Sequence, residues 1–134
     1  MKKIIYICVF LCSILASCSI GDEATSKLKL LPIDEAITPQ SFTYGVTDSV
    51  SIKYSLPNGC HYYHSLYYQY QDTTRIVAVR AVELLDQNCT EAITQIERKF
   101  AVKPTQRKDY VFKFWKGVDA NGEDLFEEKI VPVN

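Results

Sequence analysis

The feature that most constrains the fold of this 134-residue chain is a strict alternation of side chains over residues 49–56. The apolar positions are Val50, Ile52, Tyr54 and Leu56, and the polar positions are Ser49, Ser51, Lys53 and Ser55. Successive side chains of a β-strand point to opposite faces, so this pattern predicts a strand with one buried and one solvated face. Sheets of that kind are typically antiparallel. An antiparallel sheet that covers a core on one side is therefore expected.

The rest of the chain reads as further short strands separated by turn residues. Strands are expected over residues 27–37, with an interruption at Pro32, and over residues 48–56, 62–70, 73–85, 96–102, 109–116 and 126–133. Turns are expected at 57–59, 71–72 and Asn121-Gly122, whereas residues 90–95 are compatible with a helical turn. About seven short strands without a convincing helix predict an all-β sandwich over residues 27–134.

The number of strands, the length of this region and the final hairpin resemble an immunoglobulin-like sandwich. Tyr110, between Asp109 and Val111 at the start of the penultimate strand, resembles the tyrosine corner of such folds. The tryptophan between two cysteines that marks immunoglobulin domains is absent, because Trp115 follows both. The resemblance implies an antiparallel immunoglobulin-like β-sandwich of about seven strands. The residues that precede it are expected to include a signal peptide.

The N-terminus has the three parts of a secretory signal. Lys2 and Lys3 precede an apolar run over residues 4–15, and the small residues Ala16 and Ser17 follow it. The run is shorter than the roughly 20 residues that span a bilayer as a helix. A cleavable signal peptide over residues 1–17 is therefore favoured over a transmembrane anchor.

The tetrapeptide Leu15-Ala16-Ser17-Cys18 resembles the lipobox of bacterial lipoproteins. The resemblance implies a diacylglycerol on Cys18 and an acylated N-terminus, which together suffice for stable membrane anchoring. The alternative is an ordinary secreted protein with a free Cys18. The small polar residues 18–26 are expected to form a flexible tether. Asp22 and Glu23 resemble the surface-export signal of Bacteroides-type lipoproteins and slightly favour the cell surface over the periplasmic face.

The expected signal peptide and lipidation decide which cysteines can form a disulfide. Of five cysteines, Cys8 and Cys12 leave with the signal peptide and Cys18 carries lipid. Cys60 and Cys89 remain in an oxidising compartment, which favours one disulfide. The alternative is a pair of reduced thiols at strand ends.

Three segments of the mature chain resemble small lipoproteins of Flavobacterium and its relatives: Tyr54-x-Leu56-Pro57-Asn58-Gly59-Cys60, Asn88-Cys89-Thr90-Glu91 and Tyr110-Val111-Phe112-Lys113-Phe114-Trp115. The resemblance implies a location in the cell envelope, with the outer membrane favoured, and brings no activity with it. After cleavage, 13 basic and 16 acidic residues remain. This mildly acidic balance argues against nucleic acid as a partner.

Residues 62–70 contain five of the nine tyrosines. Simple alternation places Tyr62, Leu66, Tyr68 and Tyr70 on one face of a strand, and Tyr63 and Tyr67 on the other. Exposed aromatic side chains are enriched in recognition surfaces. Tyr63 and Tyr67 are therefore the candidate binding surface for a protein or a glycan. The alternative is that they pack against neighbouring strands.

No metal or cofactor site is predicted. Cys60-His61-x-x-His64 contains zinc-type ligands, but His61 and His64 point to opposite faces of a strand, and Cys60 is assigned to the disulfide. Residues 119–124 gather oxygen ligands, but the glycine position does not match a calcium loop, and a hairpin turn is the better interpretation.

No catalytic motif of the G-x-S-x-G or H-E-x-x-H type is present in the sequence. The sequence thus predicts a lipid-anchored envelope protein with a non-catalytic binding or structural role. The alternatives are an accessory subunit of a larger surface complex and a metal- or ligand-binding sensor.

Overall fold

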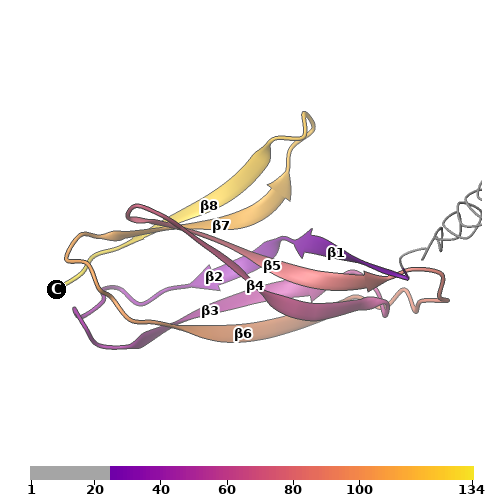
Figure 1. Cartoon of the computed structure of the whole chain (residues 1–134), viewed down its shortest axis with the longest axis horizontal. Helices are drawn as coiled ribbons and strands as arrows, with labels where there is room; N and C mark the ends of the chain where they lie inside the picture. Colours follow the sequence, from indigo (N-terminus) through magenta and orange to yellow (C-terminus); the bar gives the residue numbers. More distant parts are fainter. Residues whose placement is uncertain (1–24) are drawn as a thin grey trace, which may run out of the picture.

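A computed structural model describes residues 25–134, and these residues form eight strands (Figure 1). The strands are β1 (Ser26–Leu31), β2 (Ile33–Ile37), β3 (Asp48–Leu56), β4 (His61–Gln71), β5 (Thr74–Leu84), β6 (Thr94–Val102), β7 (Tyr110–Val118) and β8 (Asp124–Val131). The expected signal peptide (1–17) and Cys18 lie outside the described residues. In residues 25–134 there is no helix long and apolar enough to cross a membrane.

The strands form two sheets that pack face to face, which confirms the predicted β-sandwich. The smaller sheet has the order β2-β3-β6, and the larger sheet contains β1, β4, β5, β7 and β8. Val50, Ile52 and Tyr54 of β3 are buried, as their alternation predicts. They meet the inward side chains of the larger sheet, chiefly Val77, Val79, Phe112 and Phe114. Apolar burial from both sheets holds the layers together.

The chain passes from the larger to the smaller sheet at Pro32. Leu31 is the last residue of β1 and pairs with Val79, whereas Ile33 opens β2 and pairs with Tyr54. A proline has no N–H to donate to a ladder, so it suits the point where one pairing ends and another begins. Leu31 and Ile33 are both buried, so the crossing is fastened on either side by the core.

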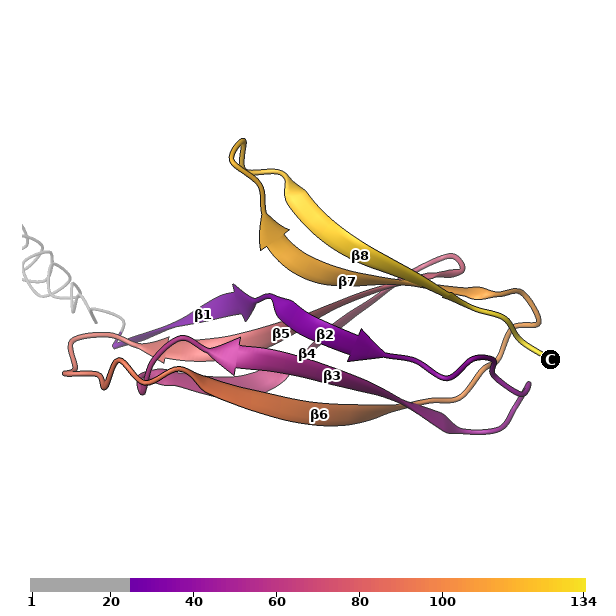
Figure 2. The ribbon, with the colours of Figure 1, turned by 180° about the vertical axis from the view of Figure 1, so that it is seen from behind.

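Strand β5 organises the larger sheet. One of its edges pairs with β4 over the whole length of β5. The other edge pairs with β7 over Thr74–Val77 and with β1 from Val79 to Leu84. The β7–β8 hairpin consequently diverges from β1, and its tip stands away from the rest of the sandwich (Figures 1 and 2). Among the strand ladders, β5–β7 is parallel and the others are antiparallel.

The tyrosine corner expected at Tyr110 is present. Tyr110 is buried, and its hydroxyl accepts a hydrogen bond from the backbone N–H of Thr105 at 3.2 Å. The Tyr110 ring packs edge-on against Phe42, with ring centroids 5.6 Å apart. Phe42 in turn forms a parallel bridge with Val133, so the segment before β3 is joined to the C-terminus.

Two turn regions complete the comparison with the sequence. The hairpin at Asn121-Gly122 is found, with Gly122 at φ 83° and the Asp119 carboxylate accepting the backbone N–H groups of Asn121 and Glu123. Of residues 90–95, which were compatible with a helical turn, residues 90–93 have no regular secondary structure and Thr94 and Gln95 begin β6. Strand β1 begins at Ser26, the last residue of the expected tether.

Candidate functional site

The start of β4 is fastened by the predicted disulfide. Cys60 and Cys89 are bonded, with their Cα atoms 5.4 Å apart and 29 residues of sequence separation. The neighbouring Gly59 donates its backbone N–H to the carbonyl of Thr90 at 2.9 Å. The bond therefore joins the turn before β4 to the loop that follows β5.

The two histidines lie in different environments. His61 is buried, with Nδ1 2.7 Å from Asn58 Oδ1 and Nε2 3.9 Å from Glu83 Oε1. His64 is exposed, with Nδ1 3.0 Å from Ser65 Oγ. Within residues 25–134 no group of three His, Cys, Asp or Glu side chains is placed to hold a metal ion.

Glu83 links the buried histidine to two lysines. The Lys27 ammonium lies 3.2 Å from Glu83 Oε2, and the Lys29 ammonium lies 3.6 Å from it. Lys27 first, and Lys29 after it, lower the pKa of the Glu83 carboxyl below its usual range. This cluster fastens β1, β4 and β5 together at the end of the sandwich that carries the disulfide.

A β-bulge divides the tyrosine-rich strand β4. Tyr63 pairs with Ala81 and Ser65 pairs with Arg80, so His64 is an extra residue in the ladder. One extra residue reverses the alternation of faces. The expectation that Tyr63 and Tyr67 share the outer face is therefore wrong, because the bulge places Tyr63 on the inner face.

Tyr63 has a packing role at the edge of the core. Its ring centroid lies 6.2 Å from that of Tyr54, and the Arg98 guanidinium lies 3.6 Å from the Tyr63 ring centroid. Arg98 also donates to the Tyr54 hydroxyl at 3.2 Å. Tyr63 is thus partly buried against residues of the opposite sheet.

Tyr67 lies on the outer face of the larger sheet. It pairs with Ala78, and the Arg80 guanidinium lies 4.9 Å from its ring centroid. Its hydroxyl donates to Gln69 Oε1, which fixes the direction of the ring. Tyr67 therefore presents an oriented aromatic side chain on the solvent side of the sheet.

Two adjoining hollows meet at Tyr67 and Leu30, and together we call them the outer groove. One has a volume of about 270 Å³ and the other about 200 Å³. The groove is lined by Leu28, Lys29, Leu30, Tyr67, Gln69, Ile76, Ala78, Arg80, Trp115, Asp124 and Phe126. It lies where β1 and the β7–β8 hairpin leave β5 in different directions, so the divided sheet creates the hollow.

Trp115 forms one wall of the outer groove. It pairs with Phe126 across the hairpin, and its indole N–H donates to Asp124 Oδ1 at 2.8 Å. Trp115 could not be predicted as part of this site, because it is 48 positions from Tyr67 in the chain. A usable signal lay in β1, where Leu28 and Leu30 occupy one face while Leu31 occupies the other. The face with Leu31 also carries Lys27 and Lys29, so the signal is the pair of large apolar side chains on the face that would otherwise be solvated.

The chemistry of the groove is apolar and aromatic, with polar groups at its rim. Aliphatic side chains and the aromatic side chains of Tyr67, Trp115 and Phe126 line it together. Leu28 is 63% exposed and Phe126 is 39% exposed, although both are large apolar residues. Such a surface can bind apolar groups and stack against rings.

Comparison with known proteins agrees with the fold. Residues 50–129 match the model of the ORF11 beta-sandwich domain. The chain belongs to the ORF11 beta-sandwich domain family. The match begins in β3 and ends in β8, so the ORF11 domain includes Tyr67, Trp115 and Phe126 of the outer groove. No curated protein and no solved structure matches the chain.

Proposed function

We propose that this ORF11 domain protein is a lipid-anchored, non-catalytic binding module of the cell envelope, most consistent with the outer membrane. The signal-like N-terminus and Cys18 support the anchor, and the outer groove supports the binding role. The observation that carries the proposal is the meeting of Leu30, Tyr67 and Trp115, from three separate strands, around one solvent-facing hollow.

The lining of the groove favours a protein partner over a glycan. Tyrosine and tryptophan side chains dominate the energetics of protein interfaces when they lie in well-packed apolar pockets. Leu28, Leu30 and Ile76 add aliphatic surface, which an apolar side chain of a partner would cover. A sugar would leave that aliphatic surface poorly matched.

A photo-crosslinking amino acid at Leu28 tests the proposal in cells that produce the protein. We expect an adduct of one defined mass, which is lost when Tyr67→Ala and Trp115→Ala are added. The matched control carries the crosslinker at Lys99, an exposed position in β6 of the smaller sheet. Equal adducts at both positions, or an adduct at Leu28 that survives the double substitution, would overturn the proposal. If no protein adduct forms and the protein binds a glycan array through the outer groove, the partner is a glycan and not a protein.

A second candidate function is an accessory subunit of a larger surface complex. It is favoured by two strand edges that border the groove: within residues 25–134, β1 pairs only with β5, and β7 beyond Phe114 pairs only with β8. Exposed strand edges are templates for an added strand from another chain. A stable stoichiometric complex in detergent extracts would support this role, whereas a transient adduct supports the binding module.

A further inference from the structure

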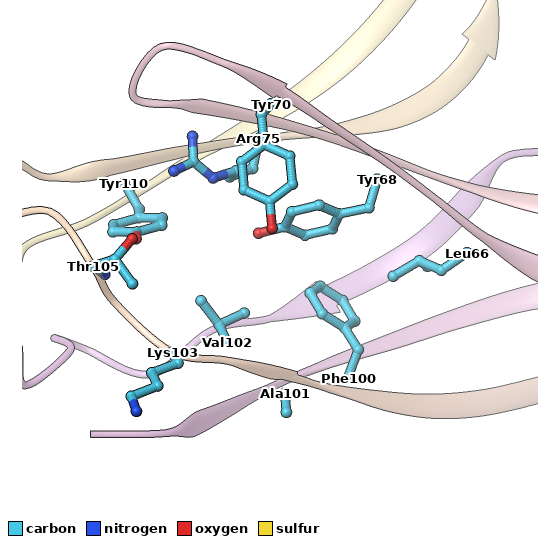
Figure 3. A pocket seen from close by; sticks show the side chains of 10 residues that line it. All are labelled: Leu66, Tyr68, Tyr70, Arg75, Phe100, Ala101, Val102, Lys103, Thr105 and Tyr110. Carbon is cyan, nitrogen blue, oxygen red and sulfur yellow. Dashed lines mark hydrogen bonds between the residues drawn. The ribbon is translucent and has the colours of Figure 1, made fainter. Parts of the chain in front are cut away.

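A second cavity lies between the two sheets, away from the outer groove. It has a volume of about 330 Å³ and opens between the far end of the β4–β5 hairpin and strand β6 (Figure 3). Four of its ten lining residues are aromatic: Tyr68, Tyr70 and Tyr110 from the larger sheet and Phe100 from the smaller sheet. We call this cavity the inter-sheet cleft.

Arg75 places a buried positive charge in the wall of the cleft. The residue is 4% exposed, and its guanidinium lies 4.6 Å from the Tyr70 ring centroid and 4.7 Å from the Tyr110 ring centroid. Nη1 donates to the backbone carbonyls of Asp72 and Thr74, and Nη2 donates to the side-chain oxygen of Gln106. All three acceptors are neutral.

The charge of Arg75 is therefore not neutralised within residues 25–134. No carboxylate in this part of the chain forms an ion pair with Arg75, and Nε has no hydrogen-bond partner there. A buried charge without an opposite charge, and a buried donor without an acceptor, both cost free energy. Nε is also covered by protein atoms, among which the Tyr70 and Tyr110 rings lie over the guanidinium. An anion that reaches Nε after the Tyr70 ring moves aside would remove both costs.

The other residues of the cleft leave this role to a ligand. No acidic side chain lines the cleft, and Lys103 projects away from it (Figure 3). Burial raises the pKa of Tyr68 to about 12, so its hydroxyl stays neutral and remains a hydrogen-bond donor. Tyr70 is 72% exposed, so its ring can rotate away from Arg75 without disturbing the core.

We infer that the inter-sheet cleft binds a small carboxylate with a ring-shaped body, its carboxylate accepting from Arg75 Nε and the Tyr68 hydroxyl, and its ring lying against the edge-to-face pair of Tyr68 and Phe100. Arginine and carboxylate form strong charge-assisted hydrogen bonds. The Tyr68 and Phe100 rings contact each other edge to face, with centroids 5.8 Å apart, and together form one aromatic surface for the ring. Acidic sugars and aromatic acids share this chemistry, and the site is independent of the outer groove.

NMR titration of the purified mature protein tests the inference. The probes are glucuronate and benzoate, with glucose and benzyl alcohol as their neutral counterparts. We expect saturable shifts of the Arg75 Nε–H signal and of backbone amides near Tyr68 for one or both acids, and no such shifts for the neutral compounds. Whether glucuronate or benzoate binds more tightly identifies the sugar or the aromatic acid as the source.

Substitutions separate binding from folding. Arg75→Gln is expected to weaken binding more than tenfold, and Tyr68→Phe, which keeps the ring, about threefold to tenfold through loss of one hydrogen bond. The matched control is Lys103→Gln, which removes a charge at the rim and should change the affinity less than twofold. If Arg75→Gln does not fold, Tyr68→Phe and the Nε–H signal still decide. Absence of saturable shifts, equal shifts with the neutral probes, or a larger effect of Lys103→Gln than of Tyr68→Phe would overturn the inference.

Discussion

A single inserted residue decides which tyrosines of β4 can meet a partner. His64 is the bulged residue, and it turns Tyr63 inward to Tyr54 while Tyr67 faces solvent. The two tyrosines therefore have different roles. Tyr63 stabilises the edge of the sandwich, and Tyr67 lines the outer groove. Substitution at each position separates the two roles.

Tyr63→Ala is expected to lower the free energy of unfolding by about 2–4 kcal/mol, because it leaves a cavity between Tyr54 and Arg98. Tyr67→Ala, on the solvent face, is expected to cost less than about 1 kcal/mol. Urea unfolding of the two variants measures the difference. Equal losses of stability would contradict the assignment of Tyr63 to the core and of Tyr67 to the outer face.

Tyr68 gives a prediction for alkaline pH. Burial raises its pKa from the ordinary value of about 10 to about 12, although nearby Arg75 acts in the opposite direction. Because the folded-state pKa is raised, the stabilisation from the neutral phenol is full below pH 10 and is lost as the pH rises towards 12. Ultraviolet titration of tyrosinate should show a late phase that Tyr68→Phe removes and Tyr62→Phe, at an exposed ring, retains. A late phase that persists in Tyr68→Phe would contradict the assignment of the raised pKa to Tyr68.

The candidate site was predictable from the sequence only in part. Aromatic enrichment identified Tyr67, and alternation placed it correctly. The same alternation misplaced Tyr63, because a bulge has no clear signature in a run of tyrosines. Trp115 and Leu30 could not be joined to Tyr67, because their proximity depends on long-range strand pairing. Arg75 carried no signal of its own, since only the fold buries it.

The positions of the strands were largely predictable from the sequence, but the order of the strands within each sheet was not. The period of two over Ser49–Leu56 gave β3 correctly, and turn residues gave most of the strand ends. The division of one edge of β5 between β1 and β7 depends on pairings between residues far apart in sequence. Pro32 was recognised as an interruption, but its role as the crossing between sheets required both pairings.

The disulfide joins the turn before β4 to the loop after β5, and its contribution to stability can be measured. Replacing Cys60 and Cys89 together by serine should lower the free energy of unfolding by about 3.5 kcal/mol, because the unfolded chain regains the entropy of a closed loop. Denaturant unfolding of the variant, beside the oxidised and the reduced wild type, measures the effect. Reduced wild type should match the variant. A loss below about 1 kcal/mol would show that hydrogen bonds such as Gly59 to Thr90 hold this end without the bond.

The described chain begins at one end of the sandwich and finishes at the other, and this arrangement bears on where a partner lies. Thr25 accepts a hydrogen bond from Leu85, so the described chain begins at the end of the sandwich that carries the disulfide. The C-terminus lies at the opposite end (Figure 1). If Cys18 is lipidated, the residues between it and Thr25 span at most about 25 Å. Leu28, at the start of the outer groove, would then lie close to the membrane, which favours a partner in the same membrane.

The proposed lipid anchor on Cys18 can be tested by mass spectrometry. The intact mass of the membrane-extracted protein should correspond to a chain that begins at Cys18 and carries acyl chains. Cys60 and Cys89 should react with a thiol-alkylating reagent only after reduction. Cys18→Ala should leave the membrane fraction while keeping the disulfide, because each buried CH₂ of the lipid contributes about 0.8 kcal/mol to anchoring. A mature chain without acyl mass would contradict the anchor and, with it, the inference that Leu28 lies close to the membrane.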